Sequence, residues 1–165
     1  MKHIQNALVR AFGFLRYIGF EFVAEENGFV FRLRPSEEEE WHTDALTEIH
    51  VTREGFYSEM TFYVDKTDVE EEDIFLFINK YNEGPCPVKL HIADADDSYA
   101  VVGTLPNYAG VDPEYEFSFD LSEEESEAFA DEVQLSVYYL KGYMDTVLSD
   151  FTGYSYEYGE ESETA

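Results

Sequence analysis

The stretch LTEIHVTREGFYSEMTFYV, residues 46–64, decides the fold of this chain. Polar and apolar residues alternate one by one from Glu59 to Val64, which is the two-residue period of a strand with one buried face. A second apolar run, Leu46 to Val51, precedes it, and Arg53-Glu54-Gly55 separates the two runs. The stretch therefore predicts an antiparallel hairpin that is buried on one face.

Two further hairpins are predicted, one on each side of this stretch. On the N-terminal side, Phe20 to Val23 and Phe29 to Arg34 flank Asn27-Gly28, a dipeptide that tolerates the positive φ angles of a tight turn. On the C-terminal side, Val88 to Ile92 and Tyr99 to Leu105 form a third pair of apolar runs. The sequence thus predicts a sheet built from hairpins.

Two helices are predicted before and between these hairpins. Apolar residues at three- and four-residue steps indicate a helix from about residue 2 to residue 18, which Gly19 ends. The same spacing indicates a second helix over about 68–83, and Thr67 and Glu70 before it have the spacing of a capping box.

The C-terminal part predicts one more strand and a long helix. Tyr115 to Leu121 alternates between apolar and polar residues, and Ser122 with Glu125 then forms a second capping-box pattern. The helix that follows carries a continuous apolar stripe made of Phe129, Val133, Val137, Leu140, Met144, Val147, Leu148 and Phe151.

Together these elements predict an α+β fold, in which an antiparallel sheet carries helices on one face in the order α-β-β-β-α-β-β-(β)-α. The 165 residues, 44% of them apolar, suit one domain with a sizeable core. We expect this domain to cover residues 1–151 and to be followed by an acidic, tyrosine-rich tail over 152–165 that is frayed or disordered. The predicted core consists of Leu8, Leu15, Phe31, Leu33, Phe62, Phe77, Ile78, Leu90, Val133 and Leu140.

The charge of the chain restricts its partners. It has 37 acidic residues against 10 Lys and Arg, for a net charge of −27. Phosphate backbones and anionic lipid headgroups need basic residues to replace their counterions, so the sequence argues against direct nucleic-acid binding and against membrane docking. A field of this sign attracts basic protein surfaces and divalent cations instead. Part of the acid could also reflect a halophilic origin.

Cysteine content and hydropathy point to a cytoplasmic protein. Cys86 is the single cysteine, so neither an intrachain disulfide nor a thiolate metal cluster is possible. The first twenty residues contain Lys2, Arg10 and Arg16 and lack a small-residue cleavage pattern, so we do not expect a signal peptide. No apolar run reaches the length of a transmembrane helix.

Motifs for catalysis or cofactor binding are absent from the sequence. Asp94 to Ser98 begins like a calcium loop, but Tyr99 replaces the required Gly and Leu105 the bidentate Glu, so a hairpin turn is the preferred interpretation. The histidines lack zinc spacing, and we expect His50 and His91 to face outward. We therefore expect no enzymatic activity, no cofactor and no bound metal, and an enzyme that uses paired carboxylates ranks last.

What distinguishes the chain is its runs of acid. Helix dipoles explain some of them, because two runs fall in the first turns of predicted helices. The density on the last helix, six acids in about 16 Å of axis at 1.5 Å per residue, is within about a factor of two of duplex DNA. We take as partner-binding candidates the residues Glu37, Glu38, Glu39, Glu40, Glu70, Glu71, Glu72, Asp73, Glu123, Glu124, Glu125 and Glu127.

The segment Phe77-Ile78-Asn79-Lys80-Tyr81-Asn82, followed by Val88 to Ile92 and a long terminal helix, resembles the YbjN-like proteins, which share the type III secretion chaperone-like fold. The resemblance covers about residues 2–151. It implies a non-enzymatic, acidic module that binds protein segments and often dimerises. The strand at Tyr115 to Leu121, the Glu37 to Glu40 loop and the extreme charge depart from the family pattern.

Two functional hypotheses follow. In the first, the chain is a protein-binding module of chaperone-like fold that docks on a partner with a basic or exposed hydrophobic surface, with a homodimer as one option. In the second, it is a DNA-mimic inhibitor of the phage or mobile-element type, which occupies the basic nucleic-acid-binding surface of a target protein.

Overall fold

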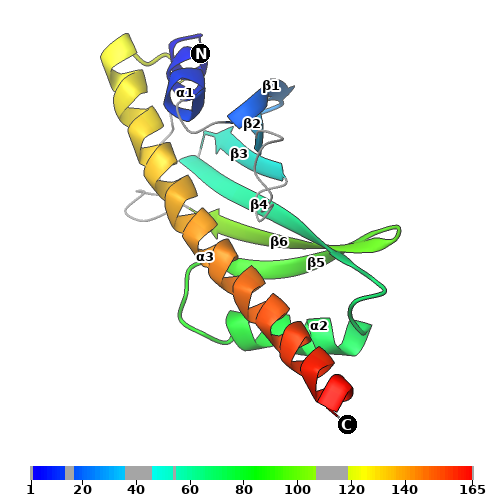
Figure 1. Ribbon diagram of the computed structural model, residues 1–165. Helices are drawn as coiled ribbons and strands as arrows, with labels where there is room; N and C mark the ends of the chain where they lie inside the picture. Colours follow the sequence, from blue (N-terminus) through cyan, green and yellow to red (C-terminus); the bar gives the residue numbers. More distant parts are fainter. Residues whose placement is uncertain (1, 14–16, 36–45, 54, 107–118, 165) are drawn as a thin grey trace.

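The structure is a computed structural model that describes residues 2–13, 17–35, 46–53, 55–106 and 119–164, with the backbone alone described for residues 18, 35 and 152–164. These residues form one antiparallel sheet and three helices (Figure 1), which establishes an α+β fold. The elements in chain order are α1 (Lys2–Gly13), β1 (Tyr17–Glu25), β2 (Gly28–Pro35), β3 (Leu46–Thr52), β4 (Gly55–Asp65), α2 (Glu71–Asn82), β5 (Lys89–Ala95), β6 (Ser98–Pro106) and α3 (Glu123–Thr164).

The sheet has six strands in the order β1-β2-β3-β4-β6-β5. The three predicted hairpins are confirmed as β1-β2, β3-β4 and β5-β6. After α2 the chain returns as β5, and β6 then pairs with both β4 and β5, so β5 runs parallel to β4 one strand away and forms an edge of the sheet. Four strands precede α2 instead of the three expected, since each of the first two hairpins contributes both of its strands.

One face of the sheet packs against the helices. Burial along β3 alternates, with the side chains of Thr47, Ile49 and Val51 fully buried. In Figure 1, α3 runs across this face, with α1 beside its first turns and α2 beside its other end. Most of the predicted core is confirmed as buried, namely Leu8, Phe31, Leu33, Phe62, Ile78, Leu90, Val133 and Leu140. Phe77 is only partly buried, and Leu15 lies outside the described residues.

The first helix is shorter than predicted. It ends at Gly13, and Tyr17 and Ile18 already belong to β1, where they pair with Pro35 and Arg34. The buried Tyr17 ring packs edge to face on Phe12 at 6.0 Å, so the residues expected to continue the helix complete the sheet instead. Gly19 does not end a helix; it has φ of +72° beside an irregularity in the β1-β2 register.

Two local predictions about turns and caps are wrong. The β1-β2 register pairs Glu25 with Gly28, so the turn is Glu26-Asn27 and Gly28 starts β2. Thr67 does not cap α2, because its amide and hydroxyl both donate hydrogen bonds of 2.9 Å to Oδ1 of Asp65. Glu70 occupies the N-cap position and makes no side-chain capping bond. The Thr67 hydroxyl therefore bonds to the nearby carboxylate of Asp65 and does not form the predicted capping box.

The start of α3 agrees with the sequence. The amide of Glu125 donates to Oγ of Ser122 at 3.1 Å, and the Ser122 amide donates to Oε1 of Glu125 at 3.3 Å, which confirms the capping box. The predicted apolar stripe is buried from Phe129 to Phe151, apart from the partly buried Leu148.

The residues before α3 and its C-terminal end can be compared with the predicted strand over Tyr115 to Leu121 and with the predicted tail over 152–165. Of the strand predicted over Tyr115 to Leu121, residues 115–118 lie outside the description and residues 119–121 have no strand conformation. The α3 backbone is helical to Thr164, through the segment predicted to be a frayed tail. Among the described residues, none of the helices has the length and hydropathy needed to cross a membrane.

Candidate functional site

The acidic clusters occupy separate parts of the molecule. Glu70 to Asp73 are exposed at the start of α2, and Glu123, Glu124, Glu125 and Glu127 are exposed at the start of α3, whereas Glu37 to Glu40 lie outside the described residues. Glu127 pairs with Arg10 of α1 at 3.5 Å. In contrast, α2 packs on the Phe151 region of α3, about 36 Å farther along the helix at 1.5 Å per residue. The structure therefore does not merge the two described clusters into one patch.

An exposed apolar row follows the acid on α3. Leu135 is 70% exposed, and Tyr138 and Tyr139 are each at least half exposed. At 100° per residue these three side chains lie on the side of α3 opposite its buried stripe, together with the exposed Asp131 and Glu132 one turn earlier. We call Leu135, Tyr138 and Tyr139 the outer row. A helix that buries one apolar stripe and exposes another offers a surface suited to a second macromolecule.

The α2 helix repeats this arrangement on a smaller scale. Ile74 and Ile78 point into the core, whereas Leu76 is 68% exposed and Phe75 is nearly half exposed. These two exposed residues follow the acidic first turn, Glu71 to Asp73, with the buried Ile74 between the turn and Phe75. On both helices, therefore, carboxylates precede exposed apolar side chains.

Aromatic contacts hold α2 and the segment after it against α3. The Phe77 and Phe151 rings meet edge to face at 5.2 Å, and the Tyr81 hydroxyl donates a hydrogen bond to the Asp150 carboxylate. Partial burial of Tyr81, together with Asp150, raises the pKa of its phenol above the ordinary value. Farther along, the thiol of Cys86 lies 4.0 Å from the Tyr139 hydroxyl. The free thiol thus contacts the edge of the outer row.

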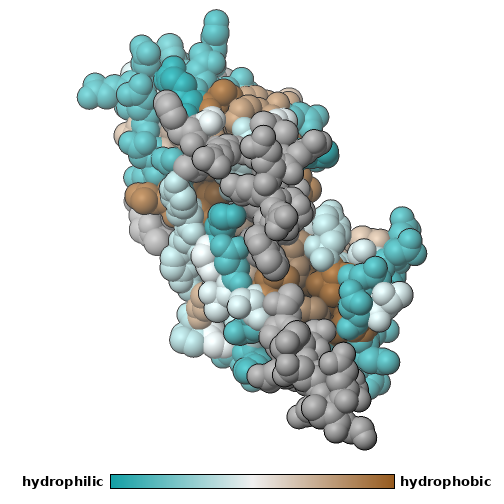
Figure 2. All heavy atoms as spheres, in the orientation of Figure 1, coloured by the Kyte–Doolittle hydropathy of each residue, from teal (hydrophilic) through white to brown (hydrophobic). Residues whose placement is uncertain are grey.

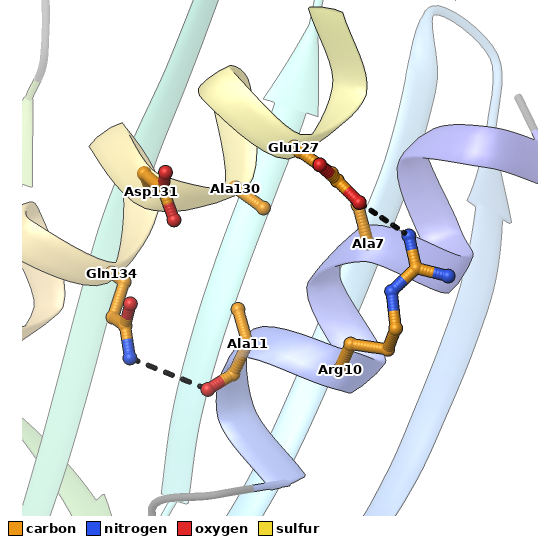
Figure 3. Close-up of a pocket in the computed structure, with 7 residues that line it drawn as sticks. All are labelled: Ala7, Arg10, Ala11, Glu127, Ala130, Asp131 and Gln134. Atoms are coloured by element: carbon orange, nitrogen blue, oxygen red, sulfur yellow. Dashed lines mark hydrogen bonds and ion pairs between the residues drawn. The ribbon is translucent and has the colours of Figure 1, made fainter. Parts of the chain in front are cut away.

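A cavity of about 330 Å³ opens between α1 and α3 (Figure 3). Ala7, Ala11 and Ala130 form its apolar part, and their small size lets the two helices approach closely. Nε2 of Gln134 donates to the Ala11 carbonyl at 3.3 Å, and the Arg10–Glu127 pair closes the other side. The side chains lining this cavity include no nucleophile with a neighbouring base, so we interpret it as a helix-packing groove.

Hydrophilic and hydrophobic surface are unevenly distributed. Figure 2 shows hydrophilic residues gathered over the end of the molecule where α1 and α3 begin, with hydrophobic residues appearing farther along the same view.

The histidine and calcium-loop predictions have mixed outcomes. His91 is exposed as expected. His50 lies on the sheet face away from the helices, also as expected, but its side chain is only 16% exposed and lies beside Glu48 and Glu59. This group is not among the residues predicted from the sequence, although a two-residue period and the register about Gly55 would have placed its members together. In the stretch from Asp94 to Ser98, Asp96 and Asp97 form the β5-β6 turn, and the residues on either side belong to the paired strands.

Comparison with known proteins adds no relative. No family model, no curated protein and no solved structure matches this chain.

Proposed function

We propose that this protein is a non-enzymatic, acidic protein-binding module with a type III secretion chaperone-like, YbjN-like fold. Its partner would be a protein that presents basic side chains around an apolar patch. The observation that carries the proposal is the outer row, Leu135, Tyr138 and Tyr139, exposed beside Asp131 and Glu132. The absence of catalytic motifs from the sequence supports the non-enzymatic part.

The chemistry of the outer row suits a protein interface. Tyrosine contributes a large apolar contact area and a hydroxyl that finds a partner at a wet rim, and it is enriched at interface centres. The carboxylates one turn away would steer a basic partner toward the row and fix its orientation, because rim charges act mainly on encounter. The net charge of −27 supports a basic partner over a second copy of this chain, since two copies repel each other.

The DNA-mimic hypothesis rests on the acid density at the start of α3, where Glu123, Glu124, Glu125, Glu127, Asp131 and Glu132 are all exposed. A mimic needs this acid to continue along the helix at a spacing comparable to phosphates. The outer row interrupts it after about two and a half turns of 3.6 residues. The interruption therefore favours docking on a protein surface over DNA mimicry. The experiment below distinguishes the two.

The test captures the partner from native cells with three versions of the full chain. These are the unaltered protein, a variant with Leu135→Ser, Tyr138→Ser and Tyr139→Ser, and a control with Phe75→Ser and Leu76→Ser on α2. We expect one protein to be retained by the unaltered chain and by the α2 control and to be lost from the outer-row variant. Far-UV circular dichroism should be unchanged in both variants, because all five positions are exposed.

Two results would contradict the proposal. If the outer-row variant retained the partner as well as the unaltered chain does, the outer row would not contribute to binding. Retention of a nucleic-acid-binding protein that is released by added duplex DNA, again without dependence on the outer row, would establish mimicry instead.

A further inference from the structure

A mixed group of ligand-type side chains lies on the sheet face that points away from the helices. Glu48 and His50 are two residues apart on β3 and therefore share that face, opposite the buried Thr47, Ile49 and Val51. Glu59 of β4 pairs directly with Glu48 in the β3-β4 register. One ligand atom from each of Glu48, His50 and Glu59 lies within 4.8 Å of the others.

The His50 ring is held with one nitrogen directed at this group. It stacks on Tyr57, its cross-strand neighbour, at 4.4 Å between ring centres and 6° between planes. Its Nε2 lies 3.8 Å from Oε2 of Glu59, too far for a hydrogen bond. Nε2 is buried, and within the described part of the chain it has no hydrogen-bond partner. A buried nitrogen of this kind needs an explanation, and a bound ion is one of the few that proteins use.

The negative charge of the group is only partly neutralised by neighbouring basic residues. Nε of Arg32 lies 3.0 Å from Oε2 of Glu48, and the same guanidinium is 3.8 Å from Glu21. Arg32 therefore divides its positive charge between the carboxylates of Glu48 and Glu21. Among the described residues, the ion-pair partner of Glu59 is His50 alone. Two carboxylates directly opposite each other on neighbouring strands repel, and a divalent cation between them would remove that repulsion.

We propose that Glu48, His50 and Glu59 form a zinc site. Imidazole nitrogen with carboxylate oxygens is a ligand set that zinc accepts, and three protein ligands leave a fourth position for water or for a group from a partner. Calcium and magnesium prefer ligand sets made of oxygen, so His50 argues for zinc over these ions. Arg32 would act from outside the ligand set by orienting Glu48 through its free carboxylate oxygen.

The spacing of the three ligands explains why the sequence does not predict a metal site. Zinc motifs on helices or loops repeat within a few residues, whereas these ligands come from two strands and meet only through the β3-β4 register. The site lies on the opposite face of the sheet from α3, so its test is independent of the proposed function.

The test is calorimetric titration of the metal-free full chain with zinc chloride, in buffer containing excess magnesium to occupy the many surface carboxylates. We expect one saturable zinc per chain. His50→Gln and Glu59→Gln should each weaken the affinity for zinc by at least about tenfold. His91→Gln is the matched control, because His91 is exposed on a strand of the same sheet and is absent from the ligand group. Cobalt in place of zinc should give the visible absorption of a low-coordinate site, and His50→Gln should abolish it.

Two measurements keep the proposal falsifiable if a variant is poorly folded. Thermal melts of each variant report folding directly, and a long-range proton–nitrogen spectrum of the unaltered chain reports whether zinc shifts His50 Nε2. The absence of saturable zinc binding, equal affinity in a folded His50→Gln or Glu59→Gln variant, or an unshifted His50 Nε2 would overturn the proposal.

Discussion

Gly28 and Val51 approach so closely across β2 and β3 that a Cβ on Gly28 would lie 1.8 Å from the Val51 carbonyl oxygen. Gly28 pairs with Thr52 in the register of these two neighbouring strands. Glycine is required at position 28 because the strands would otherwise have to separate, and not because of the turn that precedes it.

Gly28→Ala should therefore destabilise the protein, by about 1–3 kcal/mol or more, which is the usual cost of overpacking. Gly142→Ala is the matched control, since a Cβ at this exposed position of α3 meets nothing within 4 Å. There the change should stabilise by about 0.5–1 kcal/mol, the difference in helix propensity. Urea unfolding measures both, and a Gly28→Ala protein as stable as the unaltered chain would contradict the close approach.

The roles of Gly19, Gly28 and Thr67 are the parts of this fold that were predicted wrongly from the sequence. Alternation in residues 46–64 and the Ser122–Glu125 spacing depend on local periods, so the hairpins and the start of α3 could be predicted. The roles of Gly19 and Gly28 depend on which strand lies beside them, and Thr67 depends on the competing carboxylate of Asp65. The strands beside Gly19 and Gly28 are not visible in a local pattern, whereas Asp65 stands two residues before Thr67, so its competition for the threonine hydroxyl could have been recognised in the sequence.

The candidate sites divide in the same way. Acid runs are visible in the sequence, and the structure places those on α2 and α3 at exposed first turns. The exposure of Leu135 follows from which side of α3 the sheet covers, and the grouping of His50 with Glu59 follows from strand register. The exposure of Leu135 is a property of packing that a local pattern does not show, whereas the grouping of His50 with Glu59 follows from the two-residue period and the hairpin about Gly55 and could have been predicted.

Two phenylalanine positions should differ in their contribution to stability. The sequence predicts about 3–5 kcal/mol for Phe77→Ala, the range for a buried phenylalanine. Because Phe77 is only partly buried against Tyr81 and Phe151, we now expect about half of that range. Phe31→Ala, at a fully buried ring, should cost the full amount. Equal losses in denaturant melts would show that the α2 packing is wrong.

Asn82 joins the end of α2 to β5 as a strand neighbour would. Its Oδ1 accepts from the Leu90 amide and its Nδ2 donates to the Leu90 carbonyl, both at 2.8 Å. Asn82→Asp removes the donor and places two acceptors together, so we expect a loss of about 1–3 kcal/mol in the free energy of unfolding. Asn79→Asp introduces the same charge at an exposed position of the same helix and should cost far less. Similar losses for the two variants would exclude the paired hydrogen bonds.

Tyr143 gives a pH-dependent prediction. Burial raises the pKa of its phenol to about 12, and the nearby Cys86 thiol adds to the effect. In the unfolded chain this phenol ionises near pH 10. The stability it contributes is therefore complete below about pH 10 and is lost as the pH rises toward 12. The difference in ultraviolet phenolate absorbance between the unaltered chain and Tyr143→Phe should titrate well above pH 10, and a midpoint at the ordinary value would contradict the burial.

Neutralising the acid at the start of α3 should alter binding more than folding. We expect Glu123→Gln, Glu124→Gln, Glu125→Gln and Glu127→Gln together to slow partner association and to flatten its salt dependence. Glutamine also serves in a capping box, and the exposed Arg10–Glu127 pair contributes at most about 1 kcal/mol, so the fold should survive. Stopped-flow association over a salt series, with a melt as the folding control, tests both parts. Unchanged association rates would remove the steering role of this cluster.

The most direct test of partner docking is the affinity of the purified partner for the outer-row variant, Leu135→Ser with Tyr138→Ser and Tyr139→Ser, measured at low and high salt. Loss of a central apolar contact should raise the dissociation rate and weaken affinity by at least about tenfold at both salt concentrations, because truncating an interface hot spot costs about 2 kcal/mol or more. The salt dependence of association should remain that of the unaltered chain, since Asp131, Glu132 and the first-turn carboxylates are still present. Affinity equal to that of the unaltered chain at both salt concentrations would contradict the account.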